Sequence, residues 1–169
     1  MNRTITKAIL VASLVALAAC APKRKVEDIP PAPADGNAQV QDPNAGKPLP
    51  GSQEDFVANV VSDRIFFDTD KYDVDAEDQA ALRSQAQWLA ANPTVRVTVE
   101  GHADERGTRD YNLALGERRA DAVMRYFIAL GIDPARLKTI SYGKERPVCT
   151  EAAESCWSQN RRTVSVLDN

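Results

Sequence analysis

Residues 100–119 read EGHADERGTRDYNLALGERR, and this stretch predicts a strand end, a polar loop and a helix in succession. In residues 95–100 valine alternates with polar side chains, which is typical of a strand with one buried face. Gly101 and Gly107 enclose the loop. From about residue 111 apolar side chains recur at helical spacing, and they are Leu113, Ala120, Val123, Met124 and Phe127. The chain is therefore expected to form a strand–loop–helix unit here.

Two side chains of opposite charge in this unit define a candidate binding site. On a helical projection Arg118 faces solvent, whereas Arg119 lies at the border between core and solvent and can reach the loop that carries Asp104. A guanidinium can hold a carboxylate through two parallel hydrogen bonds, and a carboxylate can accept from an ammonium, so the pair suits a zwitterion. An internal Asp104–Arg119 salt bridge that shapes the loop fits the same spacing, and the spacing alone leaves both interpretations open.

Residues 1–19 have the features of a lipoprotein signal peptide. A basic start precedes an apolar run of about a dozen residues, which is too short to span a bilayer. The run ends in Leu17-Ala18-Ala19-Cys20, which looks like a bacterial lipobox whose cysteine is acylated; an ordinary signal peptide with a chance cysteine is the alternative. Ala21, in place of aspartate, resembles the pattern of lipoproteins that are sorted to the outer membrane. Several acyl chains at Cys20 would give a firm anchor.

Residues 20–52 are predicted to be the lipidated cysteine and a disordered tether. Seven of the ten prolines fall in this segment, which has few large apolar groups. A tether of this length would average about 30 Å as a coil and approach about 100 Å when extended. Without residues 1–19 the chain loses two basic residues and no acid, so its formal charge falls from −3 to −5. Such an acidic exported chain is a poor candidate for binding nucleic acid.

Residues 53–169 are long enough for one domain with a single core. Strand-like segments end before Asp68 and occupy 137–142 and 163–167, and a helix is expected over 76–91. Asp75 is its predicted N-cap, with Asp78 in the position of a capping-box acid. The pattern predicts an α/β two-layer sandwich, with two main helices packed on one face of a small mixed four-stranded sheet.

Cysteine usage predicts one disulfide. Apart from Cys20, the chain has only Cys149 and Cys156, and in an oxidising compartment this pair is expected to close the loop before the last strand. A redox-active dithiol is the alternative, but it lacks the Cys-x-x-Cys spacing.

The sequence gives no persuasive catalytic or metal-binding pattern, so we expect neither an enzyme nor a cofactor. His102 is the only histidine, has no recognised ligand spacing around it and is interpreted as structural. Asp68 and Asp70 could bind a metal or a nucleotide sugar, but such residues more often end strands and cap turns. Trp88 and Trp157 could be binding platforms, although Trp88 lies beside an apolar helix face and is expected in the core.

Several stretches of the chain carry a resemblance to a known family. They are FFDTDKY at 66–72, VEGHADERGTRDYNLALGERRADAV at 99–123, SYGKERP at 141–147 and NRRTV at 160–164. The region from about residue 63 onward resembles the OmpA-like peptidoglycan-binding domains. With its lipobox and tether, the whole chain looks like the lipoproteins of that family that act in the Tol envelope system.

The resemblance implies a non-enzymatic protein of the outer membrane that binds the meso-diaminopimelate of peptidoglycan stem peptides. Asp104 and Arg119 fall on the family's ligand-binding aspartate and arginine. Further ligand contacts are implied at Thr69, Asp70, Tyr111, Asn112 and Leu115. The implied partners are peptidoglycan, TolB and TolA, and the implied role is envelope integrity and outer-membrane constriction at cell division. Thr69, where the family commonly has an aromatic residue, and the Cys149/Cys156 insert are departures from the family pattern.

Two other functional classes are left open by the sequence. A wall-cleaving enzyme would release soluble fragments, and a pure adaptor would bind TolB but not isolated wall.

Overall fold

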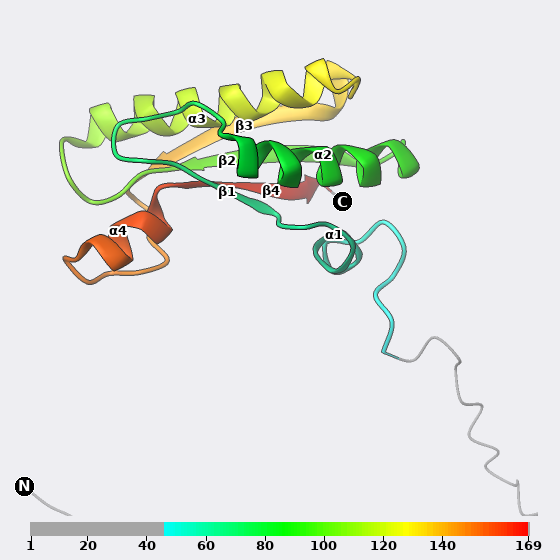
Figure 1. Cartoon of the computed structure of the whole chain (residues 1–169), viewed down its shortest axis with the longest axis horizontal. Helices are drawn as coiled ribbons and strands as arrows, with labels where there is room; N and C mark the ends of the chain where they lie inside the picture. Colours follow the sequence, from blue (N-terminus) through cyan, green and yellow to red (C-terminus); the bar gives the residue numbers. More distant parts are fainter. Residues whose placement is uncertain (1–45, 169) are drawn as a thin grey trace, which may run out of the picture. The chain divides into compact units, whose positions relative to one another are not determined.

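The computed structural model describes residues 46–168, so the predicted signal peptide, the acylated Cys20 and most of the tether lie outside the described residues. The elements, in order, are helix α1 (Gln53–Asn59), strand β1 (Arg64–Phe66), helix α2 (Ala76–Ala91), strand β2 (Arg96–His102), helix α3 (Arg109–Ala129), the short 3-10 helix η1 (Pro134–Arg136), strand β3 (Leu137–Gly143), helix α4 (Glu154–Asn160) and strand β4 (Arg162–Asp168) (Figure 1). No helix between residues 46 and 168 is both long and apolar enough to cross a membrane.

The four strands form one mixed sheet in the order β1-β4-β2-β3. Strand β4 runs antiparallel to both of its neighbours, whereas β2 and β3 are parallel and are joined by the crossover helix α3. Helix α3 packs on β2 and β3, and α2 packs beside it over β1, so both long helices cover one face of the sheet (Figure 1). The predicted fold class is confirmed.

Side-chain caps fix where the long helices begin. The Asp75 carboxylate accepts a hydrogen bond from the backbone N–H of Asp78 at 2.8 Å, as expected for the N-cap of α2. The Asp78 carboxylate, which holds the capping-box position, also accepts from the backbone N–H of Phe66 at 3.4 Å and so joins the start of α2 to β1. Helix α3 begins at Arg109, because the Thr108 hydroxyl accepts from the N–H of Tyr111.

The core lies between the sheet and the two long helices. From β2, Val97 and Val99 are fully buried there, and Trp88 of α2 packs edge-to-face on Phe56 of α1 with ring centroids 5.0 Å apart. The expectation that Trp88 is a core residue is confirmed. On β4 it is Thr163, Ser165 and Leu167 that face the helices, whereas Val164 and Val166 share the opposite, half-buried face.

Helix α3 approaches β2 at one point where only glycine fits. A Cβ on Gly101 would lie 1.9 Å from the carbonyl oxygen of Gly116, and a Cβ on Gly116 would lie 2.4 Å from the Ser141 hydroxyl. The two backbones are therefore in direct contact, which brings the N-terminal half of α3 down onto the end of β2. The predicted site lies at this end of the helix.

Gly101→Ala should lower the free energy of unfolding by about 3 kcal/mol or more, because its methyl group would force α3 away from β2. Gly131→Ala is the matched control: it has open space around it but a φ of +91°, so only about 1 kcal/mol of backbone strain is expected. Denaturant unfolding of both variants measures the difference. If both variants lose the same free energy of unfolding, the close contact between α3 and β2 does not restrict position 101 to glycine.

Asp78 should make stability depend on pH. Burial, followed by the nearby Asp75 carboxylate, raises the pKa of Asp78 from 3.8 to about 6. The folded state therefore binds more protons than the unfolded state between these values, and stability falls as the pH rises from about 4 to 6. Asp78→Asn should stabilise the protein by about 2–3 kcal/mol at pH 7 and have little effect near pH 3.5. Thermal unfolding at both pH values, beside the exposed-site control Glu117→Gln, tests this; an equal effect at both would contradict it.

Candidate functional site

The end of β2, the start of α3 and the loop after β1 enclose a pocket of about 280 Å³. Its lining includes every ligand-binding residue predicted from the sequence. These are Thr69, Asp70, Asp104, Tyr111, Asn112, Leu115 and Arg119, and they are joined by Arg106, Gly107 and Arg161. Residues up to 92 positions apart in the sequence thus converge on one concave site.

Arg119 lies deeper than the sequence predicted. It is 0% exposed, and it is not at the border between core and solvent because the loop after β1 folds over it. Its guanidinium donates to three backbone carbonyls, those of Lys71 at 2.8 Å, His102 at 2.8 Å and Asp68 at 3.0 Å. Arg119 therefore ties the β1–α2 loop and the end of β2 to helix α3.

Arg119 remains a cation that can still donate to a ligand. Burial, with the neighbouring Arg161 charge, lowers the pKa of Arg119 to about 10, so it stays protonated at neutral pH. Of its five N–H donors, the three carbonyls use one on each nitrogen. One hydrogen remains on each terminal nitrogen, and this is the pair of donors that a carboxylate needs.

Asp104 does not pair with Arg119. Its carboxylate instead accepts from the Arg106 side chain, at 2.6 and 3.2 Å, and from Nη1 of Arg161 at 3.4 Å. The hypothesis of an internal Asp104–Arg119 salt bridge is thus wrong for the site as the structure describes it. Burial alone would raise the pKa of Asp104, but the hydrogen bonds from Arg106 outweigh it and bring the pKa below its ordinary value. Asp104 is therefore a carboxylate at neutral pH.

The outer rim of the pocket comes from the loop after β1. Asp70 has a φ of +58°, a left-handed conformation that aspartate tolerates better than most residues, and its Oδ1 accepts from the Tyr111 hydroxyl at 3.0 Å. The Thr69 hydroxyl accepts from Arg106 at 3.2 Å. At the inner end, buried Asn112 donates to the Arg106 carbonyl at 2.7 Å and holds the loop above the helix start.

Arg106, Gly107 and Arg161 were not predicted as site residues. Arg106 lies inside the quoted motif, between the two glycines that enclose its loop, and Gly107 is the second of those glycines, so their position could have indicated them. Arg161 is the C-cap residue that follows α4, and no spacing in the sequence relates it to Asp104, 57 residues earlier. It is buried, and its Nε donates to the Phe67 carbonyl at 2.9 Å.

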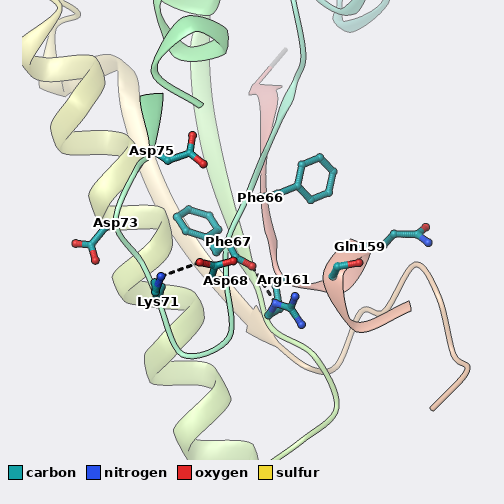
Figure 2. A pocket seen from close by; sticks show the side chains of 9 residues that line it. Phe66, Phe67, Asp68, Lys71, Asp73, Asp75, Gln159 and Arg161 are labelled. Carbon is teal, nitrogen blue, oxygen red and sulfur yellow. Dashed lines mark hydrogen bonds and ion pairs between the residues drawn. The ribbon is translucent and has the colours of Figure 1, made fainter. Parts of the chain in front are cut away.

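A larger cavity of about 540 Å³ is also lined in part by the loop after β1 (Figure 2). Phe66, Asp73 and Asp75 line it, and Arg161 is the one residue that it shares with the smaller pocket. None of the residues predicted to bind the ligand lines it. Asp68, which also lines this cavity, is exposed, and its Oδ2 lies 2.7 Å from Nζ of Lys71.

His102 is a buried residue of β2 rather than part of the pocket. It is 2% exposed, stacks near Tyr142 with ring centroids 5.6 Å apart, and neither ring nitrogen has a hydrogen-bond partner. Burial, followed by the charges of Arg162 and Arg146, lowers the pKa of His102 to about 4. Between residues 46 and 168 no three His, Cys, Asp or Glu side chains are grouped as metal ligands.

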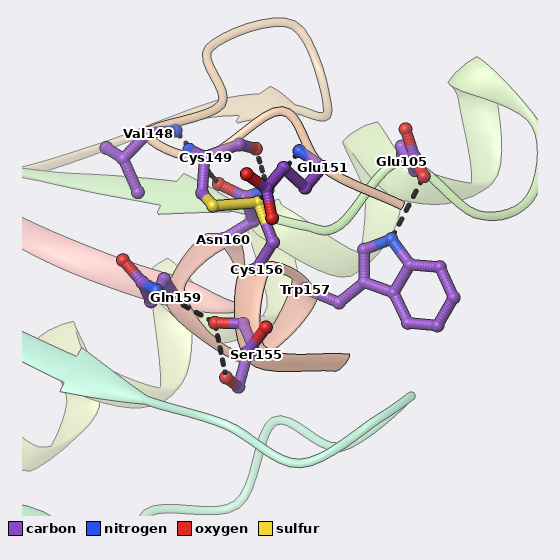
Figure 3. Close-up of a disulfide and its surroundings, with 10 residues drawn as sticks. Glu105, Val148, Cys149, Glu151, Ser155, Cys156, Trp157, Gln159 and Asn160 are labelled. Carbon is purple, nitrogen blue, oxygen red and sulfur yellow. Dashed lines mark hydrogen bonds between the residues drawn. A yellow bond between two sulfur atoms is a disulfide. The ribbon is translucent and has the colours of Figure 1, made fainter. Parts of the chain in front are cut away.

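The predicted disulfide between Cys149 and Cys156 is present, and it closes the loop that leads into α4 (Figure 3). Helix α4 carries Trp157, whose ring nitrogen donates to the Glu105 carboxylate at 3.0 Å. The insert thus contacts the loop that carries Asp104.

The geometry defines a class of protein: a small α/β domain with a pocket that offers a fixed guanidinium and a buried carboxylate. A family model for the OmpA family matches residues 66–161. Peptidoglycan-associated lipoproteins of Rhizobium meliloti and Agrobacterium fabrum are 52% and 51% identical to the chain, each over 153 residues that cover 90% of this chain and 82% of the relative. The crystal structure of the peptidoglycan-associated lipoprotein from Burkholderia pseudomallei matches with a TM-score of 0.62 and 41% identity, over 67% of this chain and 93% of that one.

The chain therefore belongs to the OmpA family, among the members named peptidoglycan-associated lipoproteins. This membership places it with binding proteins and not with enzymes.

Arg119→Lys should destabilise the fold even though it keeps the charge. A lysine ammonium cannot span three carbonyls that face a planar guanidinium, so we expect a loss of about 3 kcal/mol or more in the free energy of unfolding. Arg118→Lys, at the exposed neighbouring position, should change it by less than about 0.5 kcal/mol. Denaturant unfolding compares the two, and similar values for both would refute a structural role for Arg119.

Proposed function

We propose that the domain binds the stem peptide of peptidoglycan through meso-diaminopimelate, whose side chain ends in an ammonium and a carboxylate on one carbon. The observation that carries this proposal is that one pocket is lined by both Asp104 and Arg119, whose guanidinium keeps one N–H on each terminal nitrogen beyond those that bond to carbonyls. The ligand carboxylate would bind Arg119, and its ammonium would bind Asp104. The names of the relatives, which associate them with peptidoglycan, support the same ligand.

The electrostatic balance of the pocket favours a ligand that brings negative charge with it. Three arginines and two aspartates line the pocket, so its formal charge is +1. A zwitterion leaves this balance unchanged, whereas a lone ammonium adds to the excess positive charge. Both charges of the ligand would be desolvated, so each must meet its partner closely.

We further propose that the chain is a tether between the outer membrane and the wall. Acyl chains on Cys20 would fix one end, the segment up to residue 52 would span the gap, and the domain from residue 53 would hold the peptide. Many copies confined near a polymeric ligand gain from effective concentration, so modest individual affinity is sufficient. As part of the Tol–Pal envelope system, with TolB and TolA as partners, this tether would support envelope integrity and outer-membrane constriction at division.

The proposal is tested by co-sedimentation of the soluble chain from Ala21 onward with purified diaminopimelate-type sacculi. The wild type should pellet with the wall, and free meso-diaminopimelate should release it. Asp104→Asn is preferable to an Arg119 variant, because it removes the charge and keeps nearly the same shape. It should reduce the bound fraction by about tenfold or more.

Glu117→Gln is the matched control, because it removes an exposed carboxylate of α3 outside the pocket and should pellet as the wild type does. Circular dichroism confirms that each variant is folded. If no form of the protein pellets, wall binding is wrong and an adaptor role replaces it. Release of soluble wall fragments would identify a wall-cleaving enzyme.

A further inference from the structure

Asp104 is already occupied in the site that the structure describes. Arg106 donates to both carboxylate oxygens, from Nη2 to Oδ2 at 2.6 Å and from Nε to Oδ1 at 3.2 Å, and its backbone N–H donates to Oδ1 at 3.1 Å. Arg161 reaches Oδ2 at 3.4 Å. An incoming ammonium therefore has to displace one of these cations from Asp104.

Arg106 is the cation that can move. The Arg161 side chain is 7% exposed and is held by the Phe67 carbonyl and the Glu154 carboxylate. The Arg106 side chain is 39% exposed and lies at the mouth of the pocket. Half-exposed ion pairs exchange partners at little cost, whereas breaking a buried set is expensive.

Trp157 fixes where Arg106 lies. The Arg106 guanidinium carbon is 4.3 Å from the centroid of the Trp157 ring, within the range of a cation–π contact. The ring is itself held at its edge, because its nitrogen donates to the Glu105 carboxylate at 3.0 Å (Figure 3). Arg106 thus lies between an aromatic face and a carboxylate.

The position of Trp157 is set by the insert around α4. A helix of two turns does not hold its shape alone, and here the Cys149–Cys156 disulfide closes the segment before it. The buried Asn160 side chain adds three hydrogen bonds to this segment: its oxygen accepts from the backbone N–H groups of Val148 and Cys149, and its nitrogen donates to the Cys149 carbonyl. Trp157 is therefore presented to Arg106 from a closed, cross-linked loop.

We propose that Arg106 is an internal ligand of Asp104 that makes the pocket selective for an ammonium with a carboxylate beside it, and that Trp157 is its positioning residue. This inference rests on the proposed function and deepens it. An ammonium displaces Arg106 from Asp104 and leaves its guanidinium without a carboxylate partner. A carboxylate on the same carbon of the ligand gives the displaced guanidinium a new partner, and a lysine side chain does not.

The charge count of the pocket leads to the same selectivity. With a lone ammonium bound, the formal charge of the pocket and its ligand together would rise from +1 to +2. With a zwitterion bound it stays at +1. Removal of Arg106 eliminates both the competitor for Asp104 and one positive charge. The affinity for a lysine-type ligand should then improve more than the affinity for a diaminopimelate-type ligand.

The experiment is calorimetric titration of the soluble chain with two stem tetrapeptides that differ only at the third residue, meso-diaminopimelate or L-lysine. Arg106→Gln should lower the ratio of the two affinities by about fivefold or more, mainly by improving binding of the lysine peptide. Trp157→Leu should lower the ratio by about two- to fivefold, the strength of an exposed cation–π contact. Trp157→Phe, which keeps an aromatic face, should restore most of the wild-type ratio.

A double variant decides whether Trp157 acts through Arg106. In Arg106→Gln/Trp157→Leu the ratio should equal that of Arg106→Gln alone, because the interaction is already absent. Additive changes, or a ratio unchanged in Arg106→Gln, overturn the proposal. Loss of both affinities by the same factor also overturns it, because that result identifies an ordinary structural role.

A measurement without ligand separates this proposal from the proposed function. In nuclear magnetic resonance spectra of the free protein, the Arg106 Nε–H signal should be protected and shifted by the Trp157 ring, and Trp157→Leu should abolish the shift. If the wild type binds neither peptide but shows this signal, the proposed function fails and the Arg106–Asp104 arrangement stands as a structural contact alone, which overturns its role in selectivity. An unshifted, freely exchanging signal in the wild type overturns the positioning role directly.

Discussion

The guanidinium of Arg119, with its three carbonyl partners, is the interaction on which the rest of the site depends. It joins the loop after β1, the end of β2 and helix α3 at one point. Because the guanidinium is buried, its charge must be compensated by those carbonyl dipoles and by nearby carboxylates. The group that would bind the ligand's carboxylate is thus also the group that builds the pocket, and binding and folding cannot be separated at this residue.

The backbone contact between Gly101 and Gly116 makes that interaction possible. It holds α3 close to the sheet, so that Arg119, one turn after Gly116, reaches the His102 carbonyl. The other half of the pocket is assembled differently, from the loop of Asp104 and the cross-linked insert of α4. One side is held by backbone packing, and the other is held by side chains and a covalent bridge.

Local patterns predicted the two long helices, the strands and the N-cap of α2, because apolar periodicity and capping residues act over a few positions. The limits of α2 follow directly from Asp75 and from Asn92-Pro93. The depth of Arg119 could not be predicted, since a helical projection places a side chain on a face but does not show what covers that face. The pairing of Asp104 with Arg106 and Arg161 was missed because several arginines compete for one carboxylate, and only the folded loop decides among them.

The order of strands has a consequence for how the molecule is made. Strand β4 is the last in sequence, yet it lies between β1 and β2 and supplies the pairing partner of both. A nascent chain that has not yet reached residues 162–168 has an unpaired gap in the middle of its sheet and cannot bury its core. This domain therefore cannot complete its core until the chain has been made as far as residue 168, and the polypeptide made before that point keeps its apolar faces without their final partners.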